Sequence, residues 1–119
     1  FDKTKIKKLE KIIHPFVRKK MRKFTFLNKR RKALFFEIPL LIESKLMNYF
    51  DIVIFIKAKK KLRLKRFLKR KGDKRLFQLL NDKQMEDNKK IKFCDYVVVN
   101  EKNLNILKKN LLDIIVKYV

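Results

Sequence analysis

Arg63, Arg66 and Arg70 are the residues whose type and spacing most directly suggest chemistry in this sequence. Positions i, i+3 and i+7 share one face of a helix. The arginine guanidinium presents a planar fork of donors that binds phosphate bidentately, which a lysine ammonium cannot reproduce. Lysine greatly outnumbers arginine in this chain, so three arginines aligned on one face favour a phosphate-binding role. A solvated helix face is the alternative that the spacing alone leaves open.

Two glutamates frame a second candidate segment. Glu37 and Glu43 lie on either side of residues 39–41, and Glu37 is set in the apolar run Ala33–Ile38. A carboxylate near the end of a buried strand is costly unless it has a partner such as Mg²⁺ or an arginine. We therefore favour a partnered Glu37 over the alternative, in which it points to solvent at a strand edge.

Other common reaction chemistries find little support in the composition. His14 is the only histidine and Cys94 the only cysteine, so no Ser-His-Asp, Cys-His or histidine-based metal constellation is evident. A lone cysteine forms no internal disulfide and fits a reducing compartment, which predicts a cytoplasmic protein. Gly72 is the only glycine, so the glycine-rich loop that cradles phosphates in many ATP-binding enzymes does not occur within this chain.

The chain is strongly basic, with 35 Lys and Arg against 12 Asp and Glu and a net charge of +23. Such a field attracts polyanions, so a basic nucleic-acid-binding module is one interpretation. The other is a compositional preference for lysine on solvated faces, which we favour because lysine outnumbers arginine 27 to 8 while alanine, glycine and tryptophan are nearly absent. No apolar run is long enough to span a bilayer. We therefore expect neither a nucleic-acid nor a membrane partner.

The elements that must position these residues alternate between apolar strands and amphipathic helices. Strands are predicted at Ala33–Ile38, Asp51–Ile56 and Asp95–Val99, and helices at Lys59–Lys71, Asp73–Lys90 and Asn103–Val119. Gly72 is expected to mark the end of a helix. An N-terminal helix is expected to be interrupted at His14-Pro15, because proline lacks an amide hydrogen and disfavours helix at the preceding residue. The alternation predicts the α/β class, with ligands beyond the carboxyl ends of parallel strands.

Several short segments resemble, in order and at similar spacing, the motifs of the dephospho-coenzyme A kinase family. They are Leu9-Glu10 with Ile12-Ile13-His14-Pro15, then Phe36–Glu43, Leu62–Arg70, Gln84-Met85, and Lys90 with Asp95–Val98 and Asn100. Each motif alone is weak, whereas the ordered set spans nearly the whole chain and is specific.

The resemblance implies a P-loop kinase-like fold, in which three layers surround a parallel sheet and helical substrate and lid regions are attached. It implies an enzyme that transfers the γ-phosphate of ATP, with Mg²⁺, to the ribose 3′-hydroxyl of dephospho-coenzyme A, the last step of coenzyme A biosynthesis. On this interpretation the P-loop and the catalytic aspartate lie upstream of Phe1. The fold is then incomplete at the N-terminus, and these 119 residues alone are expected to be inactive.

By the same resemblance, residues 1–32 are a helical region that binds the coenzyme A precursor. Residues 33–119 are the remainder of the nucleotide-kinase core, with a lid at about 66–90. The implied site residues are Arg66 and Arg70 for catalysis, Arg63 and Asn100 for ATP, His14, Pro39, Leu40, Leu41 and Glu43 for dephospho-coenzyme A, and Glu37 for Mg²⁺ or its water.

Two departures from the family pattern affect these residues. Glu37 stands where the family usually has aspartate, which keeps the charge but lengthens the side chain. The segment between Arg70 and Gln84 is about one residue shorter than usual, and Leu80 stands where an arginine is common, for which Arg75 could substitute.

The alternative enzyme is another nucleoside-monophosphate-type kinase, which would share the lid arginines.

Overall fold

The computed structural model describes residues 3–119, so the first two positions of the predicted helical region lie outside the described residues. The chain divides into two compact units, Phe1–Phe36 and Glu37–Val119. The boundary falls slightly beyond the one predicted between residues 32 and 33.

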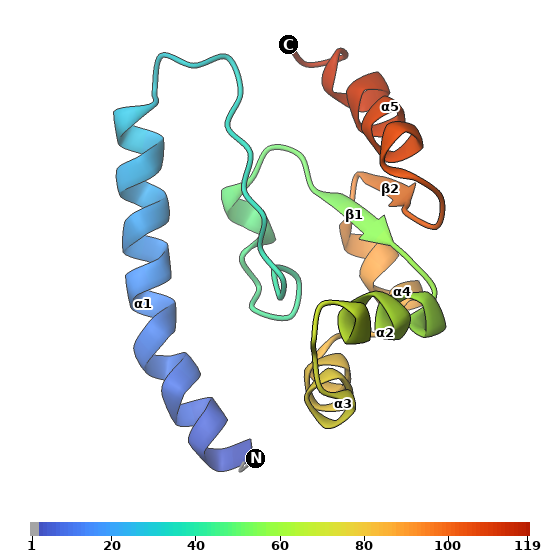
Figure 1. Cartoon of the computed structure of the whole chain (residues 1–119). Coiled ribbons are helices and arrows are strands. Elements are labelled where there is room, and N and C mark those ends of the chain that lie inside the picture. Colours follow the sequence, from blue (N-terminus) through green and yellow to red (C-terminus); the bar gives the residue numbers. More distant parts are fainter. Residues whose placement is uncertain (1–2) are drawn as a thin grey trace. The chain divides into compact units, whose positions relative to one another are not determined.

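The first unit consists mainly of one long helix, α1 (Lys3–Leu27), which contains Pro15. The predicted interruption at His14-Pro15 is wrong, because the helix continues through both residues. An internal proline removes one helical hydrogen bond and crowds the preceding turn, at a cost of roughly 3 kcal/mol. The hydrogen bonds on either side persist, and the helix bends in its N-terminal half (Figure 1). After the helix the chain turns back, and the rings of Phe24 and Phe36 meet edge to face at 5.5 Å.

The second unit is built on a two-stranded parallel sheet, β1 (Ile54–Lys57) and β2 (Tyr96–Val99). Ile54 pairs with Tyr96 and Lys57 with Val99. Two of the three predicted strands are thereby confirmed, each somewhat shorter than expected. The α/β class is also confirmed, whereas a three-layer sheet is not seen in residues 3–119.

The predicted strand Ala33–Ile38 is wrong. These residues are irregular, because within the described part of the chain no segment supplies the hydrogen bonds of a ladder. The chain then forms a compact turn that Lys45 closes with a left-handed backbone, φ 56°. The amide of Leu46 donates to the Leu41 carbonyl at 3.1 Å, as at the end of a helix. A short 3₁₀ helix, η1 (Met47–Tyr49), leads towards β1.

Most of the remaining helices lie between β1 and β2 in the chain, and the last one follows β2 (Figure 1). They are α2 (Lys60–Lys69), α3 (Lys74–Lys83), α4 (Asp87–Lys90), the 3₁₀ helix η2 (Ile91–Phe93) and α5 (Leu104–Ile115). The single helix predicted over Asp73–Lys90 is therefore two, separated at residues 84–86. The amide of Gln84 ends α3 by donating to the Asn81 carbonyl, and Gln84 itself is extended.

The end of α2 differs from the prediction in its details. Lys71, not Gly72, adopts the left-handed conformation, φ 64°. The Gly72 amide donates to the Phe67 carbonyl at 3.0 Å, which completes the helix end. A Cβ at position 72 would collide with the Phe67 ring and lie 2.7 Å from its carbonyl oxygen, so glycine is needed for close approach. Asp73 then starts α3 by accepting the Arg75 amide at 2.6 Å.

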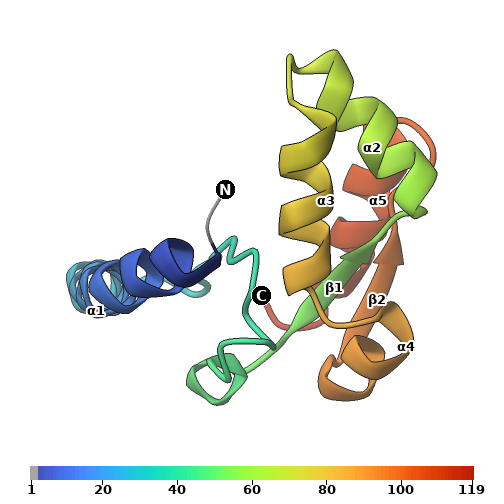
Figure 2. The same cartoon turned by 90° about the horizontal axis from the view of Figure 1, so that it is seen from below.

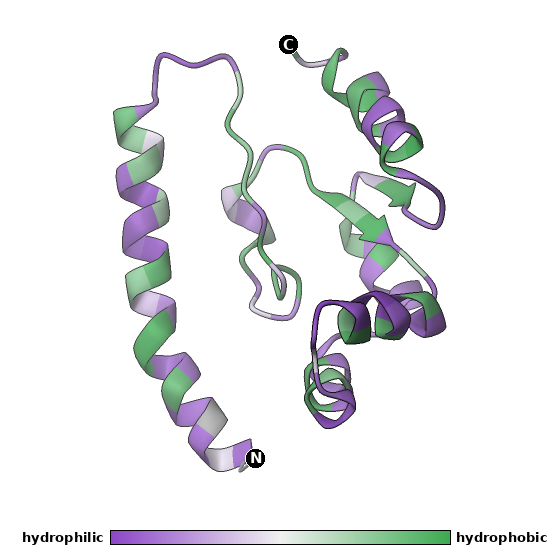
Figure 3. Cartoon of the chain, viewed as in Figure 1, coloured by the Kyte–Doolittle hydropathy of each residue, from purple (hydrophilic) through white to green (hydrophobic). Residues whose placement is uncertain are grey.

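Helices α2 and α3 pack together, and α5 packs on β2 (Figure 2). The strands are hydrophobic, whereas α2 is largely hydrophilic (Figure 3). The buried apolar side chains are Ile42, Val53, Ala58, Phe77, Val98 and Ile114. Val97 and Val99 remain exposed, so the described residues do not cover both faces of the sheet. Across residues 3–119, every helix is either too short or too polar to cross a lipid bilayer.

Candidate functional site

The three arginines singled out by their spacing line one pocket of about 280 Å³, here called the arginine pocket. Its lining residues are Arg63, Arg66, Phe67, Arg70, Phe77, Leu80, Asn81 and Gln84. It has no acidic side chain in its wall, and its volume is near the lower end for ligand pockets. A concave surface lined by three guanidinium groups is suited to an anion rather than to a neutral ligand.

Arg63 is fixed by contacts with the chain directly after β1 and with α3. Its Nε donates to the Ala58 carbonyl at 3.1 Å, and its Nη1 donates to Asn81 Oδ1 at 3.0 Å. Its guanidinium carbon also lies 5.9 Å from the centroid of the Phe77 ring. These contacts set the guanidinium at the carboxyl end of β1 and join α2 to α3. An arginine has five N–H donors, so those on Nη2 remain available.

Arg66 is fixed in a similar way at the other strand. Its Nη1 donates to the backbone carbonyl of Asn100, the residue directly after β2, at 2.7 Å. The Asn100 amide in turn donates to the Lys57 carbonyl at 2.7 Å, which ties the ends of the two strands together. The structure therefore brings Arg66 and Asn100 together at the carboxyl edge of the sheet, although Asn100 does not line the arginine pocket.

Arg70 differs from the other two arginines. It is exposed at the end of α2, and its guanidinium makes no hydrogen bond or ion pair with any residue from 3 to 119. All its donors can therefore reach a ligand. Leu80, on α3, supplies an apolar part of the same wall. The pocket thus combines two guanidinium groups of fixed orientation with one that can move.

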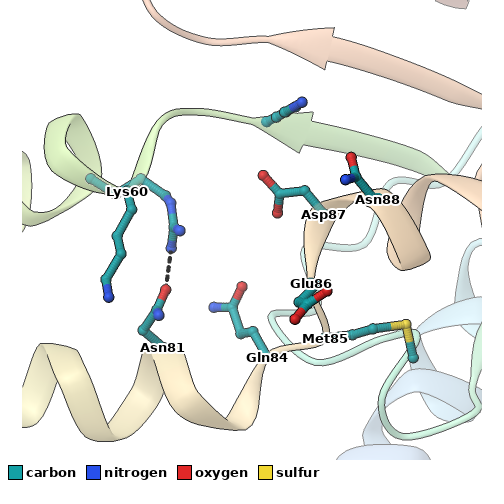
Figure 4. A pocket seen from close by; sticks show the side chains of 9 residues that line it. Lys60, Asn81, Gln84, Met85, Glu86, Asp87 and Asn88 are labelled. Carbon is teal, nitrogen blue, oxygen red and sulfur yellow. Dashed lines mark hydrogen bonds between the residues drawn. The ribbon is translucent and has the colours of Figure 1, made fainter.

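A second pocket of about 430 Å³, the strand-end pocket, adjoins the first. It is lined by Lys57, Lys60, Arg63, Asn81, Gln84, Met85, Glu86, Asp87 and Asn88 (Figure 4). Arg63, Asn81 and Gln84 line both pockets, so the hydrogen bond between Arg63 and Asn81 forms a shared wall. Figure 4 shows that bond as a dashed line, with the Gln84 and Asp87 side chains directed into the pocket. Unlike the arginine pocket, this one has mixed charge.

The sequence did not indicate that Glu43 and Lys90 meet. Glu43 Oε2 lies 3.2 Å from Lys90 Nζ, and both side chains are largely buried. The same carboxylate oxygen accepts the Met85 amide at 3.1 Å, and Lys90 Nζ donates to Gln84 Oε1 at 3.3 Å. The only indication in the sequence was that all four residues belong to segments that resemble family motifs. Their spacing could not show that Glu43 and Lys90 are in contact, because the two residues lie in different segments.

The neighbouring thiol of Cys94 donates to the Lys90 carbonyl, with a sulphur–oxygen distance of 3.3 Å. Burial raises the pKa of the Cys94 thiol, and the carboxylates of Asp95 and Glu43 add to this effect, while the Lys90 ammonium opposes it. A thiol of this kind is less nucleophilic at neutral pH than a free cysteine. Cys94 is therefore unsuited to covalent catalysis here.

The remaining predicted site residues lie elsewhere. Glu37 is exposed, so the expectation of a buried carboxylate there is wrong: the segment forms no strand, and solvent hydrates the charge. Pro39, also exposed, and the half-buried Leu40 and Leu41 belong to the compact turn before η1. His14 is exposed on α1, in the first unit. Among the described residues, no three His, Cys, Asp or Glu side chains gather as metal ligands would.

Comparison with known proteins identifies similar sequences. A sequence profile described as dephospho-CoA kinase matches residues 1–105. The chain is 32% identical over 117 residues to the dephospho-CoA kinase of Bartonella henselae, covering 96% of this chain and 60% of that protein. It is 33% identical over 121 residues to the Listeria innocua dephospho-CoA kinase, covering 99% and 60%. The chain thus spans about three-fifths of the length of these relatives.

Proposed function

We propose, since the chain belongs to the dephospho-CoA kinase family, that the whole protein carrying it phosphorylates the ribose 3′-hydroxyl of dephospho-CoA with ATP. The observation that carries this proposal is the arginine pocket, which three arginines line and in which Arg63 and Arg66 are bonded to the backbone at the carboxyl edge of a parallel sheet. Ligands of such sheets bind beyond the carboxyl ends of the strands.

The arginines would act by positioning and by neutralising charge. Phosphoryl transfer leaves little covalent work to the protein, and most of the barrier is lowered by orienting the phosphates and balancing their charge. Arg63 and Arg66 are already held by carbonyl and amide oxygens and need little reorganisation to bind an anion. Arg70 supplies the movable donor, which suits a group that closes over the transferring phosphate.

Other residues are proposed to bind the two substrates. Asn100, beyond β2, is proposed to lie near the adenine of ATP, supported by its place at the strand ends. His14 and residues 1–32 are proposed to bind dephospho-CoA. A separate proposal gives Pro39, Leu40 and Leu41, in the turn before η1, a role in binding the same substrate. These roles rest on the resemblance of the segments to family motifs.

Mg²⁺ is proposed to accompany ATP, with Glu37 as the residue nearest the metal or its bound water. The described residues offer no group of carboxylates around Glu37, so this side chain alone does not form a metal site. Mg²⁺ typically takes one or two carboxylates and completes its shell with water and substrate phosphates.

We further propose that β1 and β2 belong to a larger three-layer sheet, which would cover the exposed Val97 and Val99. Residues 66–90, which contain α3, would then form the lid. A cytoplasmic location fits the single cysteine.

The test is an assay of the whole protein with ATP, Mg²⁺ and dephospho-CoA, with formation of coenzyme A followed by chromatography. Adenosine and uridine monophosphates form the comparison panel. Preference for dephospho-CoA is expected, and phosphorylation of a nucleoside monophosphate instead would assign the chain to the other kinase type. The 119 residues alone are expected to give no product, because their one glycine cannot form a phosphate loop.

A further inference from the structure

We propose that Glu43 and Lys90 are positioning residues of this kinase, acting as a buried ion pair that holds Gln84 and Met85 in place. Gln84 lines both pockets and Met85 lines the strand-end pocket, whereas neither Glu43 nor Lys90 lines either one. The proposal rests on the proposed function, because it names how the same site is held in shape.

The contacts that hold this segment come from three separate parts of the chain. Glu43 lies in the turn before η1, Gln84-Met85 between α3 and α4, and Lys90 at the end of α4. Glu43 Oε2 receives both the Lys90 ammonium, at 3.2 Å, and the Met85 amide, at 3.1 Å. Lys90 Nζ also donates to Gln84 Oε1 at 3.3 Å. Lys90 therefore contacts the side chain of Gln84, and Glu43 contacts the backbone of Met85.

Burial makes this arrangement strongly dependent on both partners. The side chain of Lys90 is 7% exposed and that of Glu43 is 14% exposed. The ammonium also lies 5.2 Å from the centroid of the Phe55 ring. Glu43 Oε1 is buried and finds no hydrogen-bond partner among residues 3–119. Loss of the ammonium would leave a buried carboxylate without its counter-charge, which would drive Glu43 towards solvent.

Stability alone is a poor explanation for such a pair. Replacing a buried ion pair with apolar residues of similar size is often neutral or stabilising. What the pair provides is a fixed geometry, since two hydrogen bonds fix the end of α3. Asn81, which binds Arg63, lies within the last turn of the same helix. A shift of Gln84 would therefore move the wall that faces the arginines, and a displacement of about 1 Å can lower a rate by about 10²-fold.

The experiment uses the whole protein and the variants Lys90→Met, Glu43→Gln, the double variant and Lys90→Arg. Lys92→Met is the matched control, because Lys92 is an exposed lysine on η2 that lines neither pocket. The readouts are kcat and KM for both substrates, measured well below the unfolding temperature, and hydrogen exchange of the Met85 amide. Hydrogen exchange reports the geometry whether or not the protein is active.

We expect kcat to fall by about 10²-fold in Lys90→Met, with a smaller change in KM for dephospho-CoA. The double variant should be no worse than the poorer single one, because paired residues act non-additively. Lys90→Arg should recover part of kcat, Lys92→Met should match the wild type, and the Met85 amide should exchange at least tenfold faster in Lys90→Met. If Lys90→Met does not fold, the isosteric Glu43→Gln carries the same test.

Two results would overturn the proposal. One is a wild-type kcat in the folded single variants of an active enzyme. The other is unchanged exchange of the Met85 amide in Lys90→Met, whatever the activity. A wild-type protein that fails to phosphorylate dephospho-CoA would instead remove the proposed function, and faster exchange in the variant would still support the positioning of Met85.

Discussion

The guanidinium of Arg66 donates to the backbone carbonyl of Asn100 at 2.7 Å, although 34 positions separate these residues. This bond joins the middle of α2 to the chain directly after β2. It orients Arg66 at the strand ends without using its Nε or Nη2 donors, so the bond leaves a side of the fork available for an anion. Orientation by a backbone carbonyl also does not reduce the positive charge, as an ion pair with a carboxylate would.

The first prediction concerns the arginines. In the whole protein, Arg70→Ala should lower kcat by up to about 10³-fold, by analogy with other arginines that contact transferring phosphates. The free energy of unfolding of this variant should equal that of the wild type, because the exposed guanidinium of Arg70 has no partner among residues 3–119. Arg66→Ala should lower both kcat and stability, since it also loses the bond to Asn100. Steady-state kinetics and urea unfolding separate the two effects.

Lys69→Ala is the control for this series. Lys69 lies on the same helix and is exposed, yet it lines neither pocket. Its kcat should equal that of the wild type. If Arg66→Ala and Arg70→Ala also turn over at the wild-type rate, neither arginine belongs to the catalytic site.

A second prediction concerns the end of α2. Gly72→Ala should destabilise the protein by about 1–3 kcal/mol, because the added Cβ meets the Phe67 ring and carbonyl. Lys71→Gly should stabilise it by about 0.5–1 kcal/mol, because glycine relieves the left-handed backbone. Lys69→Gly places a glycine inside the helix and should therefore lower the free energy of unfolding by about 0.5–1 kcal/mol. Thermal unfolding measures all three, and a stable Gly72→Ala would contradict the close approach.

The third prediction concerns the start of the sheet. Asp95 Oδ2 accepts the Val53 amide at 2.7 Å, and the Asp95 amide donates to the Val53 carbonyl at 2.8 Å. Asp95→Ala leaves the amide of a buried residue without its partner and should cost about 1–3 kcal/mol. Asp95→Asn keeps an acceptor oxygen and should cost less. A urea midpoint of Asp95→Ala equal to that of the wild type would show that this side chain does not stabilise the sheet.

A fourth prediction follows from the raised pKa of the Cys94 thiol, caused first by burial. At pH 8 a small thiol reagent should modify Cys94 more slowly than it modifies free cysteine, because less thiolate is present. Because the thiol ionises at a lower pH in the unfolded chain than in the folded one, its contribution to the free energy of unfolding is fully present below the ordinary thiol pKa. That contribution is lost as the pH rises through the raised pKa of the folded state. Cys94→Ala should remove that part of the alkaline slope, and an unchanged slope would exclude the thiol as its source.

Sequence reasoning succeeded where local pattern decides the structure. The spacing of the arginines correctly placed them on one helix face, and the β-branched run before Lys57 and the run Tyr96–Val99 form the two strands. The helix predicted over Asn103–Val119 forms as α5 (Leu104–Ile115), which Asn103 begins by accepting the Ile106 amide at 3.0 Å.

Sequence reasoning failed where distant residues decide. Ala33–Ile38 has the composition of a strand, but a strand also needs a partner, which composition cannot supply. The predicted interruption at Pro15 is wrong because the cost of one proline is smaller than the stabilisation from the many hydrogen bonds of a long helix. The meeting of Glu43 with Lys90 depends on how the turn, α3 and α4 pack, and no periodicity encodes it.

The pairing of β1 with β2 has a consequence for how the chain folds. Val53 and Asp95 at the start of the pair are 42 positions apart, and α2, α3 and α4 lie between them. Closing a loop of that length costs about 3 kcal/mol of chain entropy. Contacts between the two strands can offset this cost only after the strands have met. We therefore expect the sheet to form after the helices that it brackets. Val98→Ala should then accelerate unfolding far more than it slows refolding, as a chevron plot would reveal.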